Sequence, residues 1–175
     1  MISSRDLARC GLFGAAALLL PTLFHLIHLG HVFMPMYLPL VALAFFVSPL
    51  PAMGTAFVTP LLSGVVTGMP PFFPPIAFFM AIELAVMAAV ISTAHTFWPK
   101  VGQGVLLFFT LLLGRVLYVG MVYTTSRFME LPAGLIAGLS VLSGWPGVVL
   151  MMAVIPGLVR LKTILGPRTL SSKGD

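Results

Sequence analysis

Two charged side chains, Glu83 and Arg115, lie inside long apolar runs, IAFFMAIELAVMAAVIS and VLLFFTLLLGRVLYVGM. A single charge near the centre of a bilayer costs at least ~2.5 kcal/mol, so such residues mark partners or ligand sites. They lie about eight and about eleven residues from the outer ends of their predicted spans, which is a similar depth at a rise of ~1.5 Å per residue. We therefore predict that they can pair. Two interpretations stay open: a structural ion pair that locks two helices, or direct contact with a ligand.

Three histidines, His25, His28 and His31, recur every three residues. This spacing brings the first two loosely onto one face of a helix. Imidazole is a common metal ligand, but no carboxylate or cysteine lies nearby, and Gly30 is expected to end the helix before His31. We therefore predict no metal site, and we take the series as polar lining of a cavity or as hydrogen bonds between helices. His28 is included among the candidate substrate contacts.

The composition predicts an integral membrane protein. The chain has 175 residues, of which 59% are hydrophobic and 7% charged, and its mean hydropathy is +1.13. A soluble domain of this length has too little interior to bury so much apolar surface. A spanning helix needs about 20 apolar residues, and about 150 residues remain between the charged tails. We predict an all-α, polytopic bundle of six transmembrane helices that forms one domain over residues 1–175, with spans of about 10–29, 38–48, 52–67, 75–93, 102–126 and 133–159.

Basic residues gather at the ends of the apolar runs, and most of them fall on one predicted side of the membrane. That side holds seven of the nine Lys and Arg residues, namely Arg5, Arg9, Lys100, Arg160, Lys162, Arg168 and Lys173. Arg127 alone falls on the opposite side. The excess of positive charge in cytoplasmic segments then places both termini in the cytoplasm. Because the charge reports topology rather than a nucleic-acid surface, we expect a lipid bilayer and no nucleic acid as a partner.

Two loops rich in proline and free of charge, GHVFMPMYLP and TGMPPFFPP, follow the first and third predicted spans. Proline removes a backbone donor and disfavours helix in the residue before it. Non-helical backbone at membrane depth is tolerated only where it is buried in protein or lines a cavity. We therefore expect both loops at the outward mouth of a binding site. Candidate substrate contacts there and on the later spans are Tyr37, Met69, Phe72, Tyr118, Tyr123 and Trp145.

Two small residues, Gly11 and Ala15, lie one helical turn apart near the start of the first span. Small residues at this spacing let a second helix approach closely, which is how helices associate inside a membrane. Packing within this protein and docking of a partner protein both remain open.

Several motifs of catalysis are missing from the sequence. It contains no GxxxxGK[ST] phosphate loop, no GxSxG nucleophile elbow, no HExxH metal motif and no second buried carboxylate for acid and base work. We therefore expect neither ATP hydrolysis nor any other enzyme activity from this chain, and no cofactor.

Five runs occur in the order PMYLP, VTPLLSGVVTGMPP, ELAVMAAV, LLLGRVLYVGM and GWPGVVLMMAVIPGLV. Together they resemble the S components, the substrate-capture subunits, of energy-coupling factor transporters for vitamins, over about His25 to Val159. The resemblance implies a six-helix bundle in the plasma membrane of a prokaryote that captures a vitamin-like organic micronutrient from outside. It also implies that Gly11 and Ala15 dock a membrane T subunit, while separate ATP-binding subunits supply energy.

Two other classes of function stay open. The chain is also consistent with a structural or assembly factor for a membrane complex, in which Glu83 and Arg115 only lock helices. A small membrane enzyme or metal carrier is the third class, and it rests on the histidines alone.

The predicted topology is directly testable at the basic C-terminal tail. We predict that a cysteine introduced at Ser172 does not react with a membrane-impermeant thiol reagent added to intact cells, because the tail lies in the cytoplasm. Labelling from outside would show that the orientation and the outward location of the site are both wrong.

Overall fold

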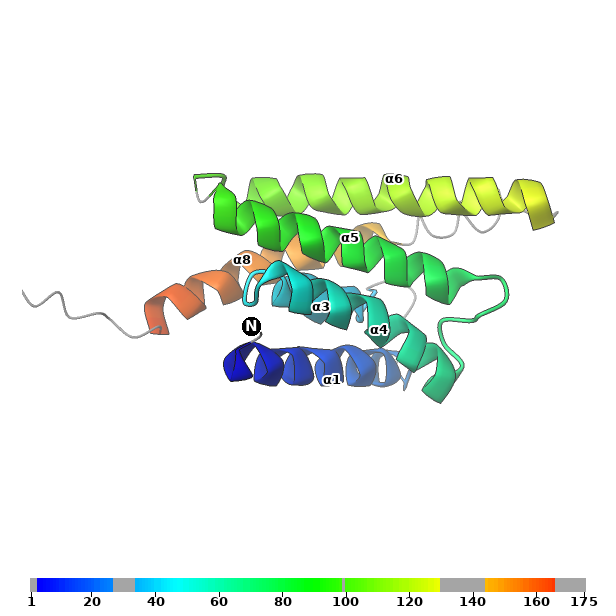
Figure 1. The fold of residues 1–175 in the computed structure, drawn as a ribbon, viewed down its shortest axis with the longest axis horizontal. Coiled ribbons are helices and arrows are strands. Elements are labelled where there is room, and N and C mark those ends of the chain that lie inside the picture. The colour runs from blue at the N-terminus through cyan, green and yellow to red at the C-terminus, as the bar shows by residue number, and fades with distance from the viewer. Residues whose placement is uncertain (1–2, 27–33, 99, 130–143, 166–175) are drawn as a thin grey trace, which may run out of the picture.

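The computed structural model describes residues 3–26, 34–98, 100–129 and 144–165. Every regular element in these ranges is an α-helix, which confirms the predicted all-α class for the described residues (Figure 1). The helices are α1 (Ser4–Leu26), α3 (Tyr37–Leu43), α4 (Pro49–Thr67), α5 (Ile76–Phe97), α6 (Gln103–Met129) and α8 (Trp145–Leu165).

Within the described residues, four helices are long and apolar enough to cross a membrane, namely α1, α4, α5 and α6. They correspond to the predicted spans 10–29, 52–67, 75–93 and 102–126, with ends shifted by a few residues. The apolar part of α8, Trp145–Leu161, is shorter. The predicted span 133–159 overlaps this helix in its second half, and its first half lies outside the described residues. These helices are those of a membrane-embedded protein.

The predicted second span, 38–48, is the main correction to the sequence analysis. Its helix, α3, has 7 residues, which is about 10 Å at ~1.5 Å per residue and about a third of the hydrocarbon thickness. The chain leaves helical geometry after Leu43 and reaches the extended residue Ser48, where Pro49 starts α4. This segment therefore does not cross a membrane by itself.

Instead, α3 is the buried centre of the bundle. It contacts α1, α4, α5 and α8, and its side chains Leu40, Val41 and Leu43 are almost completely buried. The turn after it is fixed by side chains from its neighbours: the Ser92 hydroxyl donates to the Val47 carbonyl at 2.7 Å. The apolar character of this segment thus comes from burial in protein rather than from exposure to lipid.

The remaining helices surround α3 in a simple order. The helix α5 packs between α4 and α6, and α6 also contacts α8. Figure 1 shows α6 along one side of the bundle and α1 along the opposite side. This arrangement brings the middle of α5 and the middle of α6 together beside the start of α3.

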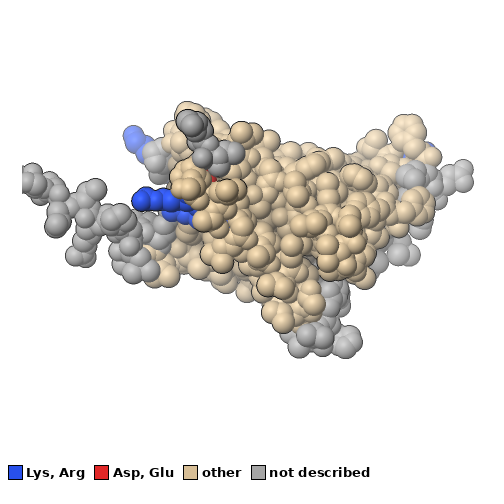
Figure 2. Space-filling view, turned by 60° about the horizontal axis from the view of Figure 1, so that its bottom comes forward, with Lys and Arg blue, Asp and Glu red and all other residues tan. Residues whose placement is uncertain are grey.

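Lys and Arg side chains gather at one end of the molecule (Figure 2). At that end lie the start of α1, the α5–α6 connection and the C-terminal part of α8 (Figure 1), which carry Arg5, Arg9, Lys100 and Arg160. Arg127, near the end of α6, lies at the opposite end. The structure therefore groups these described basic residues as the sequence predicts, and the direction of the bundle across a membrane stays a prediction.

Candidate functional site

The buried carboxylate of Glu83 is held by a tyrosine from α3. Glu83 lies near the middle of α5 with 1% of its surface exposed, and Tyr37, the first residue of α3, is 4% exposed. The Tyr37 hydroxyl donates a hydrogen bond to Glu83 Oε2. A buried carboxylate is very costly unless it is hydrogen-bonded, so this contact satisfies Glu83 and fixes the start of α3 against α5.

The guanidinium of Arg115 lies on the other side of the same tyrosine. Its Cζ atom is 5.7 Å from the centroid of the Tyr37 ring, a cation–π distance, and its Nη2 atom contacts the sulfur of Met34. The described residues form one ion pair, between Asp6 and Arg9 at 3.7 Å, and it does not involve Glu83 or Arg115. The direct ion pair between Glu83 and Arg115 is therefore not formed. The two groups lie near each other, and the Tyr37 side chain contacts both of them.

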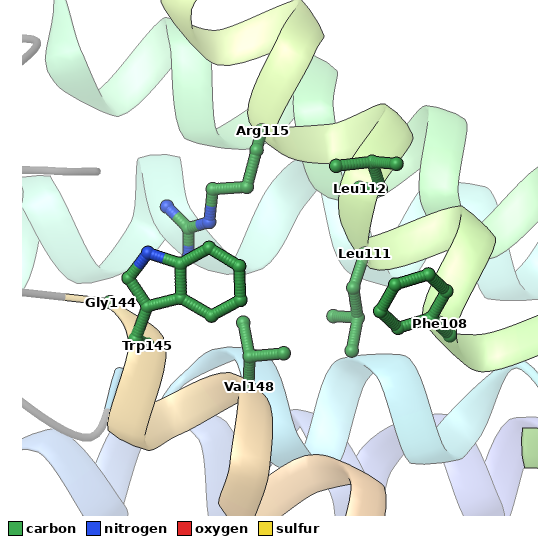
Figure 3. A pocket seen from close by; sticks show the side chains of 7 residues that line it. All are labelled: Phe108, Leu111, Leu112, Arg115, Gly144, Trp145 and Val148. Carbon is green, nitrogen blue, oxygen red and sulfur yellow. The ribbon is translucent and has the colours of Figure 1, made fainter. Parts of the chain in front are cut away.

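Arg115 also borders a cavity of about 160 Å³ between α6 and α8 (Figure 3). Among the described residues that line the cavity, Arg115 carries the charge and the others are apolar or aromatic. In Figure 3 its guanidinium extends from α6 toward the indole of Trp145 at the start of α8. The lining residues are Phe108, Leu111, Leu112, Arg115, Gly144, Trp145 and Val148. The result is an apolar chamber with a cation at one end.

Two glycines allow this close packing. A Cβ atom at Gly114 would lie 2.5 Å from the sulfur of Met87 and 2.9 Å from Glu83 Oε1. A Cβ atom at Gly144 would lie 2.9 Å from Arg115 Nη2. Such distances are below van der Waals contact, so α6 lies against the carboxylate, and α8 against the guanidinium, only because these positions have no side chain.

Three of the predicted contacts come together near Arg115, and the others do not. Tyr37 lies against its guanidinium and holds Glu83 on its other side, and Trp145 lies beside Arg115 in the cavity. Tyr118 is buried between α5 and α6, with its ring 6.3 Å from that of Phe79, and it does not line the cavity.

The remaining described candidates lie on the α4–α5 connection and the last part of α6, toward the opposite end from the Lys and Arg cluster (Figure 1). Tyr123 is exposed on α6 with the Arg127 guanidinium over its ring at 5.8 Å. Met69 and Phe72 are exposed in the α4–α5 connection, where Phe72 packs edge-on against Phe78. His28 lies outside the described residues, so its role and the absence of a metal site both stay predictions.

Sequence reasoning missed several residues of this site. Phe108, Leu111 and Val148 are apolar residues in apolar runs, and nothing in their type or spacing distinguishes a cavity wall from a lipid-facing surface. A signal did exist for Gly114, because a glycine directly before a charged residue in the run LLLGRVL marks a place where two helices approach closely.

No protein-family model, no curated protein and no solved structure matches this chain. The family resemblance of its sequence runs therefore stays a prediction.

The close approach at Gly114 gives a test of the site's packing. We expect Gly114→Ala to lower the free energy of unfolding by about 1–3 kcal/mol, because the added methyl group must displace the Met87 and Glu83 side chains. Gly120 lies on the same helix with nothing within 4 Å of its Cβ position, so Gly120→Ala is expected to be neutral or stabilising by up to ~1 kcal/mol. Unfolding by sodium dodecyl sulfate in mixed micelles measures both variants. Equal effects would contradict the close packing of α6 on Glu83.

Proposed function

We propose that this protein is a membrane-embedded substrate-capture subunit that binds a small organic micronutrient from outside a prokaryotic cell, as the resemblance to S components implies. The observation that carries the proposal is the guanidinium of Arg115 at the wall of an apolar cavity inside the bundle. We take this cation as a ligand contact rather than as a structural group alone.

The contacts of Arg115 leave room for a ligand's charge. Its described partners are the sulfur of Met34 and the ring face of Tyr37, and neither carries a formal negative charge. The nearby carboxylate, Glu83, is engaged by the Tyr37 hydroxyl. Charged groups inside a membrane are normally paired or form part of a substrate pathway. An anionic group on the substrate is therefore the partner that the cavity best accommodates, and a guanidinium binds carboxylate or phosphate oxygens in a bidentate manner.

The rest of the lining favours an apolar body on the same substrate. Phe108 and Trp145 provide aromatic surface, and Leu111 and Val148 provide aliphatic surface. Ligand sites of this kind combine apolar walls with a few polar groups that fix orientation. Trp145 is 58% exposed and therefore forms the rim through which a substrate enters. In this proposal Tyr37 and Glu83 act as positioning residues. The Tyr37 ring contacts the Arg115 guanidinium, and Glu83 accepts the hydrogen bond that fixes Tyr37.

Substitution of Arg115 separates capture of a substrate from a purely structural role. We expect the protein purified in mild detergent to carry a small organic anion that mass spectrometry detects. We expect Arg115→Gln to reduce the affinity for that molecule by more than tenfold, or about 1.4 kcal/mol. Arg127→Gln is the matched control, because Arg127 lies on the same helix but outside the cavity.

Two outcomes would contradict the proposal. One is a folded Arg115→Gln protein that keeps the molecule with unchanged affinity. The other is a purified wild-type protein without any bound small molecule, which would favour a structural or assembly factor. Size-exclusion chromatography and thermal unfolding establish that each variant is folded before binding is compared.

One face of α1 is exposed and lined by small residues, which suits docking of a partner protein. Ala15 is exposed, and nothing lies within 4 Å of a Cβ atom at Gly11. Gly14, on a different face of the helix, approaches Thr55 of α4, where an added Cβ would lie 3.5 Å from that side chain. Within the described part of the chain, the surface at positions 11 and 15 is therefore not covered by another helix of this protein. We propose that they receive a T-type membrane subunit, with ATP-binding subunits as the source of energy.

Enlarging this face tests the docking role. We expect Gly11→Leu combined with Ala15→Leu to abolish uptake of substrate by cells and to leave substrate binding by the purified protein unchanged, because both side chains point away from the bundle. Gly120→Leu, at an equally open position on α6, is expected to leave both properties intact. Loss of binding together with uptake would assign these residues to the internal fold instead.

A further inference from the structure

We propose that a hollow at the basic end of the molecule binds the phosphate group of an anionic phospholipid. The hollow has a volume of about 410 Å³ and lies between the α5–α6 connection and α8. It is far from the Arg115 cavity along both α6 and α8, and the proposal does not depend on the function of that cavity. The lining residues are Lys100, Val101, Gly102, Gln103, Gly104, Pro156 and Arg160.

The hollow carries two positive charges that face no carboxylate in the described part of the chain. Lys100 comes from the α5–α6 connection, and Arg160 comes from α8. The described acidic residues are engaged elsewhere: Asp6 pairs with Arg9, and Glu83 accepts from Tyr37. Two cations from separate segments in one concave site are complementary to a single anionic group placed between them.

The depth of the hollow matches that of lipid headgroups. Phe97 and Trp98, at the end of α5, are 72% and 64% exposed, and exposed aromatic residues at the end of a spanning helix mark the membrane interface. Lys100 is the second residue after Trp98. Arg160 lies near the C-terminal end of α8 and is followed by Leu161 and Lys162. Both cations therefore lie close to the ends of their apolar helices, at the level where phospholipid phosphates are located.

The side chains of the hollow suit a phosphodiester in particular. The Arg160 guanidinium offers paired donors to two phosphate oxygens, and Lys100 adds a compact point charge. Gln103 offers an amide that can donate to a headgroup hydroxyl. Val101 in the lining is exposed, and so are Phe97 and Trp98 shortly before it in the chain, so acyl chains have apolar surface to cover near the hollow. This apolar surface is why we assign a lipid rather than free phosphate, in the manner of basic pockets between helices that hold lipid headgroups.

Retention of lipid by the whole protein tests the proposal. The full chain is placed in nanodiscs of phosphatidylcholine with a minor fraction of phosphatidylglycerol, and native mass spectrometry counts the lipids that remain bound. We expect preferential retention of phosphatidylglycerol by the wild type. We expect Lys100→Gln combined with Arg160→Gln to reduce the preference by about tenfold or more, since each basic residue near an anionic surface contributes on the order of fivefold.

Three control variants test whether the preference depends on the charges in the hollow. Arg5→Gln removes a charge at the same end but outside the hollow, and Arg127→Gln removes one at the opposite end; both are expected to keep the preference. Exchanging the two cations, Lys100→Arg with Arg160→Lys, is also expected to keep it. Because Arg160 is exposed, Arg160→Gln alone is expected to fold normally and to show part of the loss, which provides the test if the double variant does not fold.

Two results would overturn the inference. If Arg5→Gln lowers retention as much as the substitutions in the hollow, the attraction is diffuse and no site exists. If inorganic phosphate stabilises the protein in pure phosphatidylcholine discs as much as phosphatidylglycerol does, and displaces it, the hollow binds free phosphate rather than a lipid.

Discussion

The centre of this bundle depends on two contacts made by the side chain of Tyr37. Its hydroxyl holds the carboxylate of Glu83, and its ring face lies against the guanidinium of Arg115. Helices in a membrane gain little from the hydrophobic effect when they associate, so polar contacts and close packing must decide how they fit. One aromatic residue on α3 thus ties together α5 and α6, and it lets two opposite charges share a buried region without direct contact.

The close contacts around Tyr37 explain why the cavity lies where it does. Gly114 lets α6 approach the Glu83 carboxylate, and Gly144 leaves space for the guanidinium at the start of α8. Arg115 is therefore confined on its inner sides and borders the space between α6 and α8. In the proposed function, this is the side from which an anionic group of the substrate reaches the guanidinium.

Sequence reasoning succeeded where a single physical rule dominates. The predicted spans that became α4, α5 and α6 are apolar runs bounded by prolines, glycines and charges, and the helices end within four residues of the predicted positions. Sequence reasoning failed for α3, because an apolar run has the same composition whether lipid or protein surrounds it. The role of Tyr37 was also out of reach, since its contact with Glu83 joins residues far apart in sequence. The walls of the cavity carry no distinguishing residue type.

The segment from Tyr37 to Val47 is attached at both ends to different neighbours. At its start it holds Glu83 and Arg115; at its far end the Phe46 carbonyl accepts from the Arg9 side chain at 2.7 Å, and the Phe46 ring packs on Phe13, both of α1. Most side chains of this segment are buried, and close-packed interiors transmit strain. A displacement of the tyrosine ring is therefore expected to reach α1 through the same segment.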